Sequence, residues 1–394
     1  MEVIVHRGTN QIGGCITEVK SNFGTRIIID IGANLPTADG EKKPEIDLEG
    51  LTQGKPNYDA ILVTHYHGDH IGLYNKVFNT IPIYVGEATK NIFTILQKSL
   101  SKADLVTPSD IELINQFKSF KIGDKITIKD IIVTPIAVDH SAFDAYMFLI
   151  ECDGKRLLHT GDFRTHGQRG KSVIKALKAY VGKVDCLICE GTTLSRDKEP
   201  LLTEMQLQNK AEKIFKNSKY NFILCSSTNI DRIAAFHKAA LKEHKMFICD
   251  KYQLEVLEYV NSIAKSELYK FNSSAKTKVY CYGDNMLEKM EKYGFVMLIR
   301  TNKLSRKIIE KFPQNTFIYS QWLGYLKGTN KDYKRIQEIV PKEHIYLHTS
   351  GHADSTAIKD VCTIVAPKII IPIHTEKPEQ FNELRTKKLY NKTS

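Results

Sequence analysis

Short apolar runs separated by glycine-rich or polar turns dominate the first half of the chain. We expect each run to form a strand, because runs of about four to eight apolar residues bounded by turn signals are typical of buried strands. Such runs lie at residues 2–6, 15–20, 25–31, 59–64, 81–85, 125–138, 146–151, 157–160 and 184–189. The segment 86–103 differs, because Ile92, Ile95 and Leu96 recur at helical spacing and predict a helix. Residues 36–57 are polar and predict a surface loop.

After about residue 195 the pattern changes to helices that alternate with strands. Helical patterns cover 203–217, 230–243, 250–265, 304–311 and 331–340. Strand-like runs lie at 221–225, 246–249, 278–281, 295–300 and 316–319. Alternation of this kind favours a parallel sheet. The first pattern returns near the end, with strands predicted at 344–348 and 368–374 and a helix that begins near Asp354.

One polar stretch, residues 65–70 (HYHGDH), directly follows an apolar strand-like run. His65 and His67 are two positions apart, so their side chains share a face in an extended chain. The chain can turn at the glycine that follows, and the turn directs Asp69 and His70 at a second point. Neutral imidazole and carboxylate are ligands that zinc prefers. The stretch therefore predicts two metal ions side by side at the rim of a sheet.

Several other predicted strands also end in side chains that can bind or support a metal ion. The residues at these ends are Asp30, His140, Asp162, Glu190 and His374. Because strand after strand ends in this way, we expect His140 and Asp162 to be metal ligands. Asp30 ends a buried run, and it either supports the metal loop from behind or caps a turn.

The turn Ser226-Ser227-Thr228-Asn229 lies between a predicted strand and a predicted helix. Free backbone amides at such a helix N-terminus can bind phosphate, and Arg232 lies in the first turn of the helix. Capping of the helix by Thr228 or Asn229 accounts for the same residues equally well. The sequence leaves both interpretations open.

Composition indicates a globular protein with a basic balance. The 394 residues are 42% hydrophobic and 26% charged, and 56 Lys and Arg against 45 Asp and Glu give a net charge of +11. This excess favours a polyanionic partner such as nucleic acid. No run approaches the roughly 18 apolar residues of a membrane helix, and we find no signal peptide. We interpret the eight scattered cysteines as reduced thiols, and we expect a cytoplasmic protein that makes no membrane contact.

The ordered motifs resemble a known family of metallohydrolases. The stretch 65–70, then His140 and the run Thr160-Gly161-Asp162, resemble the motifs of the metallo-β-lactamase fold. Glu190, His352 within Ser-Gly-His-Ala and His374 within Pro-Ile-His-Thr-Glu resemble the three added motifs of its β-CASP branch. That branch contains ribonuclease J and the endonucleases of mRNA 3′-end processing. The resemblance implies an α/β fold, an αββα metallo-β-lactamase sandwich with an inserted Rossmann-like β-CASP domain.

The resemblance also implies where the domains begin and end. Residues 1–195 would form the first part of the metallo-β-lactamase domain, and residues 346–394 its second part. Residues 196–345 would form the β-CASP domain. The change of pattern near 195 and the return near 345 agree with this division.

Seven residues correspond to ligands of two Zn²⁺ ions, with Mn²⁺ as the alternative metal. One ion would be held by three histidines, His65, His67 and His140. The other would be held by Asp69, His70 and His374. Asp162 would bridge the two ions.

The resemblance places Glu190 and His352 beside the scissile phosphate. We expect His352 to be the general acid for the leaving 3′ oxygen, tuned by Glu190, and Asp69 to orient the attacking hydroxide. His348 has a counterpart in the family, and its role stays open. The other histidines lie outside the motifs: we expect His6 and His159 in the core or at a strand edge, and His166, His237 and His244 on the surface.

The implied function is that of a dinuclear zinc ribonuclease that cleaves single-stranded RNA, in endonucleolytic or 5′-exonucleolytic mode. A lactone or thioester hydrolase on the same metal site is the first alternative, but it explains neither the β-CASP motifs nor the charge. A non-catalytic RNA-binding relative is the second alternative. Such a protein would have substituted ligands, and here none is missing.

Two departures from ribonuclease J limit what the resemblance implies. Ribonuclease J carries a further C-terminal domain, whereas this sequence stops twenty residues after His374, so the oligomeric state stays open. The segment Tyr319–Tyr325 does not match the Gly-Ser-Gln-Gly run expected in ribonuclease J. Recognition of an RNA 5′ end therefore stays open as well.

Overall fold

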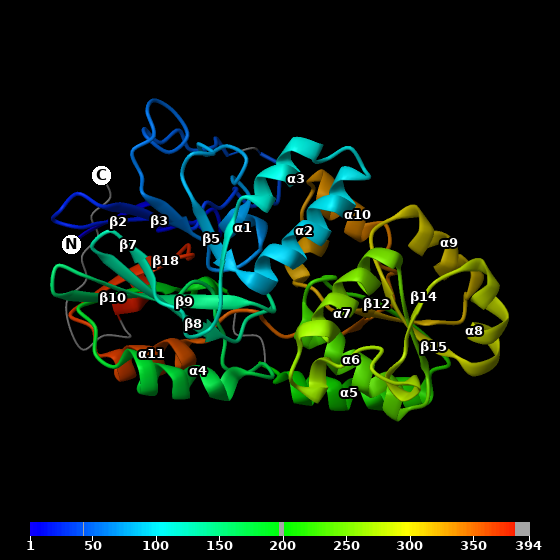
Figure 1. Cartoon of the computed structure of the whole chain (residues 1–394). Coiled ribbons are helices and arrows are strands. Elements are labelled where there is room, and N and C mark those ends of the chain that lie inside the picture. The colour runs from blue at the N-terminus through cyan, green and yellow to red at the C-terminus, as the bar shows by residue number, and fades with distance from the viewer. Residues whose placement is uncertain (42, 197–200, 383–394) are drawn as a thin grey trace.

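A computed structural model describes residues 1–41, 43–196 and 201–382 (Figure 1). Its described residues form three six-stranded sheets. The first sheet has the order β1 (Glu2–Arg7), β2 (Ile16–Lys20), β3 (Arg26–Ile29), β4 (Ala60–Leu62), β5 (Ile83–Gly86) and β6 (Lys118–Phe120). The pairs β1–β2 and β2–β3 are antiparallel, and the later pairs are parallel. The strand that leads into the predicted metal loop therefore lies inside this sheet.

The second sheet combines strands from the middle and the end of the chain. Its order is β18 (Ile369–Ile373), β11 (Cys186–Glu190), β10 (Lys155–His159), β9 (Ala145–Cys152), β8 (Ile131–Val138) and β7 (Ile126–Ile128). The strands β18, β11 and β10 are parallel, with Ile373 opposite Glu190. The last strand of the chain is thereby placed beside strands that precede it by more than 170 residues.

The two sheets pack face to face and share one apolar core. Val19 and Leu62 of the first sheet lie in this core with Phe148, Leu157 and Ile188 of the second. The outer face of the first sheet carries α2 (Glu87–Ser101) and α3 (Pro108–Asn115), and that of the second carries α4 (Gly170–Ala176) and α11 (Ser355–Val365) (Figure 1). This is the predicted αββα sandwich. The segment predicted as a helix over 86–103 is α2, which buries Ile92 and Phe93.

The third sheet forms a separate lobe beside the sandwich (Figure 1). Its order is β14 (Val279–Cys281), β13 (Met246–Cys249), β15 (Phe295–Ile299), β12 (Tyr220–Leu224), β16 (Thr316–Tyr319) and β17 (Ile345–Tyr346). All five pairs are parallel, as the alternation of strands and helices predicted. Numbered along the chain, the order is 3-2-4-1-5-6, whereas a Rossmann sheet has 3-2-1-4-5-6.

Helices cover both faces of the third sheet. One side packs on α5 (Glu204–Asn217), α6 (Ile230–Lys242) and α7 (Lys251–Ile263), which contribute Phe215, Phe236 and Val256 to the core. The other side packs on α8 (Leu287–Tyr293), α9 (Lys303–Lys311) and α10 (Lys331–Gln337). Side-chain caps define several of these helices, and Thr203 forms a capping box at the start of α5.

Several elements differ locally from those predicted, and the strand β6 is among those that were not predicted. The strand predicted at 344–348 is only β17, and it completes the third sheet because Tyr346 pairs with Tyr319. The helices α3, α4 and α8 were not predicted. Within the metal loop, the predicted turn is a short helix, α1 (Gly68–Ile71). Residues 383–394 of the last predicted part lie outside the described residues, and the division at 195 and 345 stays a proposal.

Two histidines that the sequence analysis placed on the surface are buried. The ring of His237 packs between Phe247 and Phe271, and the Nε2 of His166 is 2.8 Å from the carbonyl oxygen of Ser350. The surface prediction was wrong because local charge and spacing do not show which distant segments pack over a side chain. The exposed His244, the buried His159 and His6 on the edge strand β1 agree with the prediction.

Within the described residues, no helix combines the length and the apolar character needed to span a membrane. All eight cysteines are free thiols, as the sequence analysis expected. The cytoplasmic location stays a prediction.

Candidate metal centre

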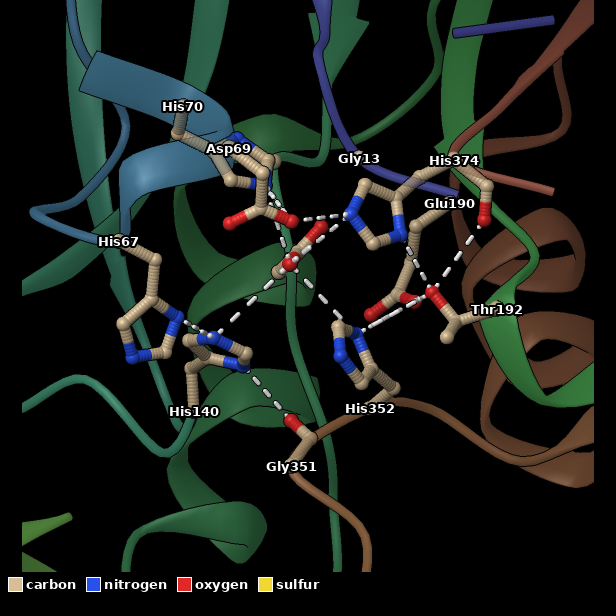
Figure 2. Close-up of polar contacts among 12 residues, drawn as sticks. Gly13, His67, Asp69, His70, His140, Glu190, Thr192, Gly351, His352 and His374 are labelled. Atoms are coloured by element: carbon tan, nitrogen blue, oxygen red, sulfur yellow. Dashed lines mark hydrogen bonds and ion pairs between the residues drawn. The ribbon is translucent and has the colours of Figure 1, made fainter. Parts of the chain in front are cut away.

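The predicted ligands converge at one rim of the sandwich, where parallel strands end. The stretch 65–70 follows β4, His140 follows β8, and Asp162 follows β10. Glu190 is the last residue of β11, and His374 directly follows β18. His352 lies in the loop before α11 and points into the same cluster (Figure 2). The structure therefore brings together every residue that the sequence analysis assigned to the site.

Three histidines form the first ligand group. The Nε2 of His65 is 3.1 Å from the Nδ1 of His67, which is 3.2 Å from the Nε2 of His140. Tetrahedral zinc with ligand distances of about 2.0–2.1 Å would hold its ligands about 3.3 Å apart. The three nitrogens are thus spaced as ligands of one ion.

Two aspartates and two histidines form the second group. The Oδ2 of Asp69 is 3.1 Å from the Nε2 of His374 and 4.0 Å from the Nε2 of His70. The Oδ2 of Asp162 is 3.2 Å from His70 and 3.7 Å from His374. These separations again suit ligands around one ion, although the group is wider than the three histidines.

Asp162 stands between the two groups. Its Oδ2 is 3.9 Å from the Nε2 of both His65 and His140, besides its short distances to the second group. Its other carboxylate oxygen is buried without a hydrogen-bond partner, as is the Nε2 of His70. A buried polar atom without a partner is costly, and a metal ion would satisfy both atoms. The residues present therefore fit a metal centre with a shared carboxylate.

A second set of contacts fixes the orientation of the ligands. Asp30 has a left-handed backbone (φ 61°), and its carboxylate accepts a hydrogen bond from the backbone N–H of Thr64. The same carboxylate lies 2.7 Å from the Nδ1 of His70. The Nδ1 of His140 donates to the carbonyl of Gly351 at 2.7 Å (Figure 2). Of the two interpretations of Asp30, support of the metal loop is the one that the structure shows, and such contacts set the tautomer of a ligand.

Glu190 and His352 form a hydrogen-bonded pair at the edge of the cluster. The Nδ1 of His352 is 3.0 Å from the Oε2 of Glu190 and 3.5 Å from the Oδ2 of Asp162. The other oxygen of Glu190 accepts from the backbone N–H of Phe163. His352 is the more open member, with 18% of its side chain exposed, whereas Glu190 is fully buried.

The hydroxyl of Thr192 connects this pair to the second ligand group, and the sequence analysis assigned it no role. Its Oγ1 donates to Glu190 at 2.8 Å and lies 2.6 Å from the Nδ1 of His374 (Figure 2). Thr192 stands two residues after Glu190, where a hydroxyl next to a motif carboxylate is the only sequence signal.

Burial and neighbouring charges divide the histidines into two classes. Burial lowers the pKa of His65 and His140 and lowers that of His67 to about 4, so these imidazoles are neutral, the form that binds metal. Burial also acts to lower the pKa of His70 and His374, but the nearby carboxylates, Asp162 first among them, together outweigh burial and raise both values. The second group thus attracts positive charge, which a metal ion would supply in place of protons.

Charged residues behind the centre join the two lobes. Arg164, two positions after Asp162, is fully buried and pairs with Asp139, Glu204 and Asp231 at 2.9–3.0 Å. Arg232 is also fully buried, and its guanidinium is bound by Glu204. This network was not predictable from the sequence, because no local pattern shows that these residues meet.

The network also decides between the two interpretations of the turn at 226–229. Asn229 caps α6, since its side-chain oxygen accepts from the backbone N–H of Arg232 at 3.2 Å. The Arg232 guanidinium binds Glu204 and the carbonyl of Thr349, so it is committed to protein partners. The Nδ1 of His348 lies 3.3 Å from Arg232, which places His348 in this network. Capping is the role that these contacts support.

Comparison with known protein families agrees with the site geometry. Residues 25–261 match the family described as Beta-lactamase superfamily domain. Residues 338–391 match the family described as Zn-dependent metallo-hydrolase RNA specificity domain. The chain belongs to the metallo-β-lactamase superfamily. The resemblance to its ribonuclease J-like β-CASP branch is confirmed.

Individual relatives are distant but cover most of the chain. Ribonuclease J of Sinorhizobium meliloti is 22% identical over 374 residues, which are 89% of this chain and 64% of the relative. Ribonuclease J of Helicobacter pylori is 23% identical over 397 residues, 94% of this chain and 55% of the relative. This chain therefore spans between about half and two thirds of the length of these relatives. A crystal structure of a protein of unknown function from Enterococcus faecalis shares the fold, with a TM-score of 0.75 at 21% identity over 99% of this chain and 97% of that chain.

Proposed function

We propose that this protein is a dinuclear zinc nuclease that hydrolyses phosphodiester bonds in single-stranded RNA. The observation that carries the proposal is the pair of ligand groups that share Asp162, with the His352–Glu190 pair only 3.5 Å from that carboxylate. A proton-carrying pair beside a two-metal cluster suits hydrolysis of a bond with a poor leaving group.

The seven ligands divide between two ions. His65, His67 and His140 would hold one zinc ion. Asp69, His70 and His374 would hold the other, and Asp162 would bridge them. Zinc ions so placed lower the pKa of water toward 7 and neutralise charge on a phosphate. Mn²⁺ is the alternative metal, because it also accepts imidazole and carboxylate ligands.

His352 is the residue that we assign to the leaving group. Its Nδ1 is held by Glu190 at 3.0 Å and lies 3.2 Å from the hydroxyl of Thr192. This contact leaves the Nε2 as the nitrogen that can deliver a proton to the departing 3′ oxygen. Glu190 would act as a positioning residue, because its hydrogen bond fixes the orientation of the His352 ring. Asp69 would orient the attacking hydroxide through its carboxylate.

The choice of RNA rests on two further observations. The match to an RNA specificity domain lies at residues 338–391, which include His352 and His374. The net charge of +11 favours a polyanion, because contacts to phosphates dominate the affinity for single strands. The same match favours a nuclease over a lactone or thioester hydrolase.

The His352→Ala variant tests the assignment of roles. The variant should keep two metal ions per chain and lose about 10²–10⁴-fold in the rate of RNA cleavage, the usual contribution of general acid catalysis. His374→Ala should lose metal as well as activity. His244→Ala is the matched control, since His244 is exposed and lies outside the site. Metal content is measured by mass spectrometry, and cleavage with 5′-labelled and internally labelled RNA.

A substrate with a better leaving group sharpens this test. A nitrophenyl phosphodiester needs less help from an acid, so it should be cleaved by His352→Ala at a rate closer to that of the wild type. Loss of a metal ion from His352→Ala would show that His352 is a ligand. A wild-type protein that opens lactones and cleaves neither RNA nor DNA would refute the nuclease itself. The same digest distinguishes endonucleolytic from 5′-exonucleolytic cleavage.

A further inference from the structure

Trp322, the one tryptophan in the sequence, stands in the loop that follows β16. Its side chain is among the exposed large apolar groups, with 36% of its surface accessible. The indole lies against Gly324, where an added Cβ would come within 2.2 Å of the ring. The glycine therefore permits a flat aromatic surface to be held in place while part of it faces solvent.

A cation and an aromatic ring contact this indole, and a second ring packs on the first. The guanidinium of Arg196 lies 4.7 Å from the centre of the Trp322 ring. Tyr325 meets the same ring edge-on at 5.4 Å, and Tyr333 meets Tyr325 at 5.1 Å. Cation–π and edge-to-face contacts of this kind fix the orientation of an aromatic group.

Two connections join this aromatic group to the metal centre. The group comprises Trp322, Arg196, Tyr325 and Tyr333. Arg196 directly follows the short helix Thr192–Ser195, whose first residue contacts Glu190 and His374.

The second connection runs through the loop after β3. The hydroxyl of Tyr333 donates to the carbonyl of Pro36 at 3.3 Å. The neighbouring Leu35 lies close to Gly13, where an added Cβ would meet Leu35 at 2.7 Å and the Oδ2 of Asp69 at 2.9 Å. A chain of contacts thus links the second ligand group to the exposed indole.

We propose that Trp322, with Arg196 stacked on it, is a base-stacking subsite that holds one nucleobase of a single-stranded RNA beside the metal centre. The inference rests on the proposed nuclease function and adds a substrate-binding residue to it. Every base has a flat π-surface, so stacking on an indole tolerates all sequences. The guanidinium adds attraction for the adjacent phosphate. The subsite would explain how this chain grips a strand although its segment 319–325 departs from the ribonuclease J pattern.

The single tryptophan makes the subsite directly observable. Metal-loaded protein is titrated with an oligouridylate that carries phosphorothioate linkages, at low temperature, and the strand is checked on a gel afterwards. Stacking of a base should quench the Trp322 fluorescence to saturation, at the same concentration at which anisotropy of the labelled strand reports binding. A strand of equal length with abasic residues should bind through its backbone and leave the fluorescence unchanged.

Substitution measures the contribution to affinity. Stacking contributes about 1–3 kcal/mol per base, so Trp322→Ala should weaken RNA binding about 5- to 150-fold, with KM raised and kcat retained. Trp322→Phe keeps an aromatic face and should retain most of the affinity. Tyr293→Ala, which removes an aromatic side chain that is 57% exposed on α8, is the matched control and should bind as the wild type does.

The outcomes separate this inference from the proposed function. An unquenched indole at saturating RNA, equal quenching by the abasic strand, or unchanged affinity of Trp322→Ala would overturn the subsite while cleavage persists. If wild-type protein neither binds nor cleaves RNA, the nuclease proposal itself fails, and the subsite fails with it. Weak binding by Trp322→Phe as well as Trp322→Ala would also count against stacking.

Discussion

Two buried clusters of charged side chains lie close together in this protein, and they balance their charges differently. Behind the metal centre, Arg164 and Arg232 are fully buried and bind Asp139, Glu204 and Asp231. Each guanidinium there has several partners within about 3 Å, so the network carries its own counter-charges. Breaking it would leave a buried charge without a partner.

The metal centre has no such internal balance. The carboxylates of Asp69, Asp162 and Glu190 form their ion pairs with histidines: His70, His352 and His374. A histidine supplies positive charge only when it is protonated, and Asp162 retains an oxygen without a partner. Both clusters bury acidic groups, so burial of acidic groups does not by itself indicate a metal site. A buried acidic cluster whose counter-ions are all histidines indicates a metal site, because a cation is then needed to balance the charge of the carboxylates.

The largest effect is expected from the shared carboxylate. Asp162→Asn should lower the metal content of both groups and reduce RNA cleavage by roughly 10³-fold or more, because metal ions supply several kcal/mol of transition-state stabilisation. Asp332→Asn, an exposed aspartate on α10, should change neither quantity. Metal analysis and cleavage assays on both variants check this. Full metal content in Asp162→Asn would show that Asp162 is not needed to hold metal, and the contrast between the two buried clusters would fail.

A substitution in the arginine network should lower the stability of the protein and leave its metal content unchanged. Arg232→Met removes one partner of a buried pair and should lower the free energy of unfolding by about 3–5 kcal/mol, while the folded fraction keeps its metal ions. Urea denaturation measures the change. Arg306→Met is the control, because its pair with Glu338 is exposed and should matter by less than about 1 kcal/mol. An equal effect of the two substitutions would show that the buried network is not a structural link.

A smaller effect is expected at Asp30, which supports a ligand without binding metal. Asp30→Asn weakens the contact to the Nδ1 of His70 and should lower metal affinity about 10- to 100-fold. Asp104→Asn is a close control, since Asp104 also has a left-handed backbone (φ 56°) but is exposed. Competition with a chelator gives both affinities. If wild type and Asp30→Asn bind metal with equal affinity, Asp30 only caps the turn.

The smallest effect concerns the pH dependence of the arginine network. Burial acts to raise the pKa of Glu204, but Arg232 and Arg164 lower it to about 2. Its stabilisation is therefore fully present above the ordinary carboxyl value of 4.5 and is lost as the pH falls toward 2. The difference in unfolding free energy between wild type and Glu204→Gln should shrink by on the order of 1 kcal/mol from pH 5 to 3.5.

Unfolding in urea at several pH values measures this change. Glu343→Gln, at an exposed position, should follow the wild type throughout. A constant difference between wild type and Glu204→Gln would mean that the arginines do not hold Glu204 ionised.

Much of the metal centre could be predicted because its first ligands are local. His65 and His67 share a face of an extended chain, and a turn follows them, so their chemistry is visible within six residues. His140 and Asp162 were predictable because each ends a strand-like run, whereas His374 was assigned as a ligand only through the order of motifs that resembles a family. No periodicity in the sequence states that β18 lies beside β11.

The sequence by itself determined most of the strands and helices and the chemical types of the candidate ligands, because these depend on residues close in the chain. Only the tertiary structure decided which side chains support them. Thr192, Arg164 and Trp322 acquire their roles from partners far along the chain, and His166 and His237 are buried by elements that local patterns do not reveal. The physical reason is that periodicity specifies which face a side chain occupies, whereas packing of distant segments specifies what that face meets.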